Sequence, residues 1–182
     1  MEAKENRELR LTTLSDGLPA VTSSLGTTMA EAGAICFEDQ NHSNGVKLQV
    51  HGDFSVSFKV YWPKITDQML RCWNDPQDAT EHAAYGIAFL LVRSLTEYTI
   101  IRRSRKGTGF DYWLGREENE DELPFQNKAR LEVSGIRKGN NNQVSSRVKK
   151  KLDQVKPTDN LGLPAYIVVV EFSAPQSHMV QK

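Results

Sequence analysis

The sequence predicts an α/β (α+β) protein in which helices cover a mixed β-sheet, and three patterns support this fold class. Residues 46–60 and 128–136 alternate apolar and polar side chains, as strands with one covered face do. Residues 165–172 are an unbroken apolar run, which is typical of a strand covered on both faces. Residues 84–95 carry apolar side chains at the i, i+3, i+4, i+7 spacing of a buried helix.

The chain has 182 residues, a length that usually makes one domain. We expect residues 1–22 to be a flexible N-terminal arm, because they mix charges with Thr, Ser and Gly and contain few large apolar groups. Residues 23–173 should form the single α/β domain, and residues 174–182 a loosely ordered C-terminal tail.

The first half of that domain is predicted to contain a helix, a hairpin and a short helix. Ser23 is a suitable N-cap, and apolar residues recur behind it at helical spacing as far as Cys36. The alternation on either side of His51-Gly52-Asp53 predicts a β-hairpin over residues 46–60. Thr66 can cap a short helix that the Asn-Asp-Pro sequence at 74–76 would break.

The second half is predicted to alternate helices and strands. One helix is expected from Thr80 to Leu95, and another from near Ser145 to Val155, where Pro157 stops it. Residues 116–122 are acidic and residues 137–142 are rich in Gly and Asn, so the first should be a solvated loop and the second a mobile one. Strands are predicted over residues 98–101, 109–115, 128–136 and 165–172.

The composition limits the environment of the protein more than its partners. Lys plus Arg and Asp plus Glu number 23 each, so the net charge of zero points to no class of partner. Cys36 and Cys72 lie far apart in ordinary apolar segments, as reduced buried thiols of an intracellular protein do. The first ten residues are charged, and no run approaches the ~18 apolar residues of a membrane span. We therefore expect a cytoplasmic protein without a membrane partner.

Two carboxylates stand inside strands that are otherwise apolar. Asp111 lies among bulky residues of the segment 109–115, and Glu132 lies between Leu131 and Val133. A carboxylate in a buried strand generally needs a partner such as a metal ion or an arginine. Convergent carboxylates on adjacent strands are typical Mg²⁺ ligands in phosphodiester hydrolysis. The alternatives are a structural salt bridge, with Arg130 as the partner on the same face, or no special role.

The order of elements from Glu81 onward resembles that of the PD-(D/E)xK nuclease superfamily, over roughly residues 79–173. In that superfamily an acid on the first helix, an aspartate on the second strand and a Glu-x-Lys on the third strand form the site. The resemblance implies a restriction-endonuclease-like core of helix, three strands, helix and strand, here preceded by an N-terminal helix and β-hairpin. It also implies that Glu81, Asp111 and Glu132 are catalytic residues and ligands of Mg²⁺.

Serine stands where this resemblance calls for the lysine of the motif. Ser134 is therefore the fourth residue expected in the catalytic site. The lysine would orient or help to deprotonate the attacking water, and an uncharged hydroxyl is a poor substitute. Lys128 is on the same strand face but about 13 Å from Glu132 along the strand. Lysines 149, 150 and 151 of the following helix could reach over instead.

Basic residues gather around this predicted site. Residues 123–156 contain nine Lys or Arg against two acidic residues, a local excess of seven, and another basic segment, 102–106, falls in the neighbouring hairpin. Such a face would attract nucleic-acid phosphates, and the loop 137–142 could close on a backbone. The alternative is an ordinary solvated helix face. The residues expected to bind nucleic acid are Arg130, Arg137, Lys138, Lys149 and Lys150.

These expectations lead to a metal-dependent nuclease that acts on the phosphodiesters of DNA, with RNA as a less favoured substrate. The alternative is a catalytically inactive subunit with a nuclease fold, which binds nucleic acid or a protein partner in a larger assembly such as one for phage defence. A third interpretation is a module that only binds proteins. The two carboxylates favour catalysis, whereas Ser134 favours an inactive subunit.

Overall fold

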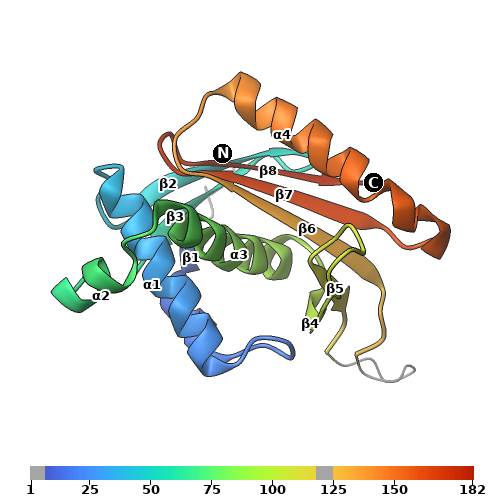
Figure 1. Cartoon of the computed structure of the whole chain (residues 1–182), viewed down its shortest axis with the longest axis horizontal. Helices are drawn as coiled ribbons and strands as arrows, with labels where there is room; N and C mark the ends of the chain where they lie inside the picture. The colour runs from blue at the N-terminus through green and yellow to red at the C-terminus, as the bar shows by residue number, and fades with distance from the viewer. Residues whose placement is uncertain (1–6, 118–124) are drawn as a thin grey trace, which may run out of the picture.

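The computed structural model describes residues 7–117 and 125–182 and has a mixed eight-stranded β-sheet at its centre (Figure 1). Most of the acidic loop predicted at 116–122 lies outside the described residues. The strands are β1 (Glu8–Arg10), β2 (Val46–Gly52), β3 (Val56–Tyr61), β4 (Thr99–Arg103), β5 (Tyr112–Gly115), β6 (Ala129–Ile136), β7 (Ala165–Glu171) and β8 (Gln176–Gln181). The helices are α1 (Ser23–Asp39), α2 (Asp67–Cys72), α3 (Pro76–Leu95) and α4 (Asn141–Gln154), with 3-10 helices η1 (Leu11–Asp16) and η2 (Lys156–Leu161).

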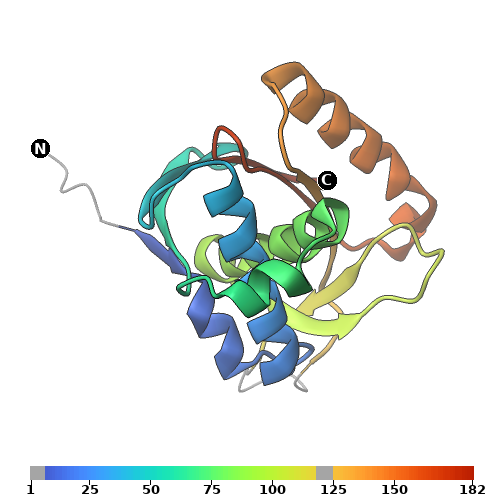
Figure 2. The same ribbon diagram turned by 60° about the vertical axis from the view of Figure 1, so that its left-hand side comes forward.

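Helices cover both faces of the sheet, so the predicted α/β class is confirmed. The strand order is β1-β3-β2-β8-β7-β6-β5-β4. Helices α1 and α3 pack together on one face, and α4 lies alone on the other, over β6 and β7 (Figures 1 and 2). Among the residues that the structure describes, no helix is long and apolar enough to cross a membrane.

The predicted strands and helices are all present, with shifted ends. The hairpin pairs β2 with β3 in antiparallel register, and all seven residues of β7 are buried between the two helical layers, as its sequence predicts. Helix α3 begins four residues earlier than Thr80, since Asp75 caps it by accepting hydrogen bonds from the N–H groups of Gln77 and Asp78. The sequence Asn-Asp-Pro at 74–76 therefore separates α2 from α3 and also provides the start of α3.

Helix α4 also begins earlier than predicted, at Asn141 instead of near Ser145. The Asn140 side chain accepts from the N–H of Gln143, and the Gln143 side chain accepts from the N–H of Asn140. This reciprocal capping box stabilises the first turn in a stretch that sequence composition alone assigns to a loop. The prediction of a loop over 137–142 is therefore wrong for its last two residues.

Residues 7–22 are docked on the domain, which corrects the expectation of a flexible arm for this part of residues 1–22, whereas residues 1–6 lie outside the described residues. Within the described part, β1 pairs with β3, and the side chains of Leu9, Leu11 and Leu14 are buried. Helix α1 approaches η1 so closely that a Cβ at Gly26 would lie 1.8 Å from the Leu14 carbonyl oxygen. These few leucines are enough to hold the segment on the domain, because each becomes almost fully buried.

The C-terminal residues form an interior strand, so the expectation of a loosely ordered tail over 174–182 is wrong. Strand β8 lies between β7 and β2, and Ser177 and Met179 are buried beneath the sheet's helical cover. Pro175 marks a tight turn between β7 and β8 instead of the end of the domain.

The two cysteines are both free, but only Cys36 is buried, so the prediction of a buried thiol is wrong for Cys72.

Candidate active site

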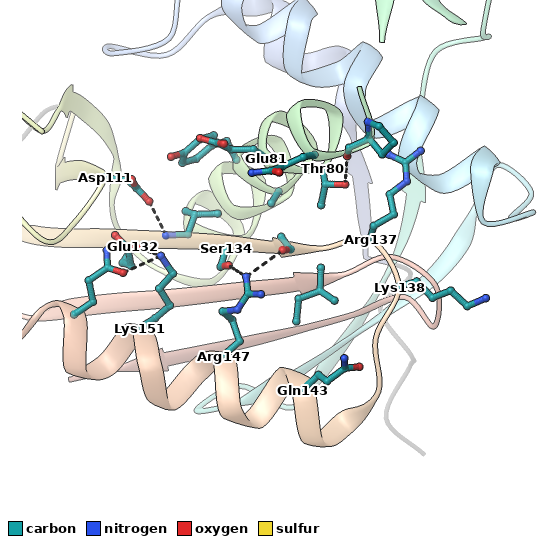
Figure 3. A pocket seen from close by; sticks show the side chains of 18 residues that line it. Thr80, Glu81, Asp111, Glu132, Ser134, Arg137, Lys138, Gln143, Arg147 and Lys151 are labelled. Atoms are coloured by element: carbon teal, nitrogen blue, oxygen red, sulfur yellow. Dashed lines mark hydrogen bonds and ion pairs between the residues drawn. The ribbon is translucent and has the colours of Figure 1, made fainter. Parts of the chain in front are cut away.

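A cavity of about 660 Å³ opens between the start of α3, the strand β6 and the helix α4 (Figure 3). Its wall includes Glu81, Asp111, Glu132 and Ser134, so the four residues that the sequence predicts to be catalytic meet at one cavity. The first three come from segments that are separate in the chain: α3, the entry to β5, and β6. The tertiary fold brings them together.

Strand β6 supplies Glu132 and Ser134 to the face of the sheet that α4 covers. Successive side chains of a strand point to opposite faces, so these two share a face while Val133 turns to the core under α3. Glu132 is 1% exposed and Ser134 is 9% exposed. At the far end of β6, Gly135 lets α3 approach, because a Cβ there would lie 2.7 Å from the Thr80 carbonyl oxygen.

Asp111 is held against β6 by backbone and side-chain hydrogen bonds. It stands one residue before β5, not within it as predicted, but its N–H still donates to the Leu131 carbonyl over 2.8 Å. Its Oδ2 atom accepts from the N–H of Val133 over 2.9 Å. This places its carboxylate beside Glu132. Glu81, in the first half of α3, is an exposed residue at the cavity's rim.

On helix α4, Arg147, Lys151 and Gln154 share one face at the i, i+4, i+7 spacing, and Gln143 lines the cavity one turn earlier. Lys151 Nζ lies 2.5 Å from Glu132 Oε1, which also accepts from Gln154 Nε2 over 2.8 Å. Arg147 Nη1 lies 2.7 Å from Ser134 Oγ. Figure 3 shows Arg147 and Lys151 reaching from α4 to β6. The helix thus brings a lysine to Glu132 and an arginine to Ser134.

The carboxyl group of Glu132 has an unusual environment. Burial is the main cause that raises its pKa to about 7, the nearby charge of Asp111 raises it further, and Lys151 opposes both. Glu132 Oε2 is buried without a hydrogen-bond partner in the described structure. A buried, unpartnered carboxylate oxygen beside a second carboxylate is suited to a hard divalent cation.

Of the predicted ligands Glu81, Asp111 and Glu132, the last two have neighbouring carboxylates. No group of three or more His, Cys, Asp or Glu side chains that could hold a metal ion occurs within residues 7–117 and 125–182. Glu81 stands at the rim of the same cavity. Further ligands for a cation at this pair would then be water or phosphate oxygens, as is common for Mg²⁺.

The free energy of unfolding should fall as the pH rises from about 4.5 to about 7, and this fall should be smaller in Glu132→Gln. The folded pKa of Glu132 lies above the unfolded value, so the folded protein keeps a proton that the unfolded chain has released. The free energy of unfolding therefore falls through this window, by an amount on the order of 2 kcal/mol. Urea unfolding in EDTA at several pH values would measure it. An equal pH dependence in both proteins would contradict this environment for Glu132.

Arg130 is a structural residue, which corrects its expected role in binding nucleic acid. It is 2% exposed and lines neither the cavity nor an open surface. Its guanidinium donates to the carbonyls of Val155 and Leu163 and to the Thr158 hydroxyl, and it pairs with Asp159. It is therefore not the salt-bridge partner of Glu132 either. Strand alternation assigned its face correctly, but the end of α4 and η2 cover it.

The other four predicted nucleic-acid-binding residues divide into two pairs. Arg137 and Lys138 line the cavity. Arg137 is anchored at the end of α1, where its guanidinium pairs with Asp39 over 3.0 Å and contacts the sulfur of Cys36. Burial raises the pKa of that thiol to about 11, and the charge of Arg137 partly offsets the rise. Lysines 149 and 150 are exposed on α4 and are not among the residues that line the cavity.

Arg147 and Gln154 are among the cavity-lining residues that the sequence-based assignment does not include, and both contact its predicted residues. Their spacing relative to Lys151 was a usable signal, since residues i, i+4 and i+7 share a helix face. The apolar stripe of Val144, Val148, Leu152 and Val155 indicates which face of this helix meets the sheet, but it does not say which strand residues lie opposite the polar side chains beside it.

Comparisons of the chain with protein-family models, curated proteins and solved structures give no match.

Proposed function

We propose that the protein is a metal-dependent nuclease that hydrolyses the phosphodiesters of DNA. The observation that carries this proposal is the contact between Lys151 Nζ and Glu132 Oε1, in a cavity that also contains Asp111. This contact supplies an ammonium group at the motif glutamate from α4, in place of the lysine that Ser134 replaces. It supports catalysis against the main objection that the sequence raises, which is the absence of the motif lysine.

The arrangement of elements gives the proposal further support. Helix α3 is followed by the antiparallel strands β4, β5 and β6, then by α4, and then by β7, which pairs with β6 in parallel. This order is the one expected of a restriction-endonuclease-like core. The hairpin of β2 and β3 extends the sheet on the far side of β8.

Three polar side chains from α4 and β6 have roles in this proposal. Lys151 orients the attacking water and offsets negative charge on the phosphate. Arg147 binds a phosphate oxygen, since its guanidinium offers several donors in a fixed plane and uses only part of them at Ser134. Ser134 then has a new role as the residue that positions Arg147.

The carboxylates Asp111 and Glu132 would hold a divalent cation, with Mg²⁺ as the expected ion. When bound, Mg²⁺ supplies charge neutralisation on the phosphate and lowers the pKa of a bound water. The unpartnered Oε2 of Glu132 is the atom best placed to accept it. Asp111 keeps one oxygen on the N–H of Val133, which fixes the direction of the other.

We expect Asp111→Asn to lower the rate of DNA cleavage by about 100-fold, because the neutral amide removes a charged cation ligand. The amide oxygen can still accept from Val133, so the local structure is retained. Cleavage of plasmid and single-stranded DNA would be measured with Mg²⁺ or Mn²⁺, and EDTA should abolish it. Equal cleavage by both proteins would mean that the activity does not come from this site.

A second candidate function is a catalytically inactive subunit that uses the same cavity to bind nucleic acid or a protein partner. The contact of Arg147 with Ser134 favours it, because a phosphate-binding arginine occupies the place of the catalytic lysine. Salt-dependent DNA binding without cleavage in either metal would support this candidate over the nuclease.

A further inference from the structure

A second cavity, of about 380 Å³, adjoins the first at the carboxylate pair. The two cavities share Asp111, Glu132 and Gln154 as lining residues. The remaining wall of the second cavity comes from the loop between β4 and β5, which contributes residues 103–107 together with Gly109 and Phe110. The carboxylates therefore stand between two open spaces, one bounded by α3 and α4 and the other by this loop.

Residues 103–107, at the end of β4 and the start of this loop, carry three cationic side chains and no acidic one. Arg103, Arg105 and Lys106 all line the second cavity, whose only acidic lining residues are the shared Asp111 and Glu132. Arg105 and Lys106 are exposed to solvent. The part of this cavity away from the carboxylates is thus a basic wall, which favours an anionic ligand such as a phosphate group.

The loop is held in one conformation, so this basic wall is built into the fold. The N–H of Ser104 donates to the Asp111 carbonyl, and the hydroxyls of Ser104 and Thr108 are hydrogen-bonded. Gly109 has a φ of 85°, and a Cβ there would lie 2.5 Å from the Gln154 carbonyl oxygen. Only glycine allows the loop to pack this closely on the end of α4.

Arg103 is fixed by aromatic rings at the junction of the two cavities. Its guanidinium carbon lies 4.5 Å from the centre of the Tyr112 ring and 5.0 Å from that of Tyr85, and Nη2 contacts the Tyr85 hydroxyl. Tyr85 in turn lines the first cavity. An arginine held in this way keeps its charge while losing little conformational entropy when it binds an anion.

We propose that the second cavity is a phosphate subsite that binds the nucleotide next to the one whose phosphate reaches Arg147 and Lys151. This inference rests on the proposed function for the placement of the reacting phosphate between the cavities. It identifies the substrate as a polynucleotide strand that crosses Asp111 and Glu132, in contact with basic side chains on both sides. A ligand with a single phosphate cannot use both cavities at once.

The test compares Arg105→Ala/Lys106→Ala with Arg102→Ala as a matched control. Arg102 is exposed on the neighbouring strand β4 and is not among the lining residues of either cavity. Binding of a short fluorescent single-stranded oligonucleotide would be followed by anisotropy in EDTA, so that no cleavage occurs. The slope of log K against log salt is negative, and we expect the double variant to reduce its magnitude by about 1.4 and the control to leave it unchanged.

The outcomes separate this subsite from the nuclease activity. Equal slopes in the double variant and the unaltered protein, or an equal change in Arg102→Ala, would overturn the subsite even if DNA is cleaved. Absence of oligonucleotide binding by the unaltered protein would overturn it as well. The expected change in slope in a protein that never cleaves DNA supports the subsite and removes only the nuclease proposal. Melting temperatures of all variants would confirm that they are folded.

Discussion

Replacement of Lys151 by methionine should lower the rate of DNA cleavage by about 1,000-fold, the largest effect on activity that we expect. Methionine keeps most of the length and apolar stem of lysine but removes the ammonium group from Glu132. The loss should fall on the turnover rate, because Lys151 acts on the attacking water and on charge that develops in the transition state. Single-turnover cleavage in Mg²⁺ would measure it.

Two further variants make this prediction specific. Lys150→Met changes an exposed lysine of the same helix that does not line the cavity, so cleavage should stay within about twofold. Adding Ser134→Lys to Lys151→Met returns a lysine to the motif position and should recover part of the lost rate. Equal cleavage rates for Lys150→Met and Lys151→Met would mean that Lys151 has no part in catalysis.

Arg130→Met should lower the free energy of unfolding by roughly 3 kcal/mol, the largest loss of stability that we expect. The substitution leaves the Leu163 carbonyl without its donor and removes the guanidinium that ties η2 to β6. In a chain of this length the melting temperature should fall by roughly 6–12 °C. Urea and thermal unfolding would measure both quantities.

The control for this prediction is Asp159→Asn, at the exposed end of the same ion pair. Asp159 is a surface carboxylate shared between Arg130 and Lys182, so its neutralisation should lower the free energy of unfolding far less than Arg130→Met does. Equal losses in the two variants would mean that the ion pair, and not the buried hydrogen bonds to backbone carbonyls, holds this region. DNA binding by Arg130→Met should keep its salt dependence, since the side chain is buried.

Much of the fold could be predicted because the signals are local. Alternation over residues 128–136 and the apolar run at 165–172 predict β6 and β7 almost to the residue. The starts of α3 and α4 were predicted too late in the chain, because Asp and Asn also occur in turns. Asp75 and Asn140 act as caps only because a helix follows each of them. The docking of residues 7–22 and of β8 depends on partners far away in the chain, which no local pattern reveals.

The candidate site could likewise be predicted only in part from local signals. Alternation placed Glu132 and Ser134 on one face of β6, and the bulky neighbours of Asp111 indicated that it enters a strand. Lys151 was one of several lysines that the sequence left open. Arg130 shares its face with Glu132, and only the position of η2 shows that it is covered.

The sequence by itself determined most elements between residues 23 and 173 and the face that their strand residues occupy, because these follow from steric repeats of two and 3.6 residues along the backbone. The tertiary structure decided which residues meet. Helix α4 is polar on most of its surface, so its rotation over β6 is fixed by the few apolar side chains, such as Val144, that it buries against β7. That rotation aims Lys151 at Glu132 and Arg147 at Ser134, contacts that are distant in sequence and absent from any local pattern.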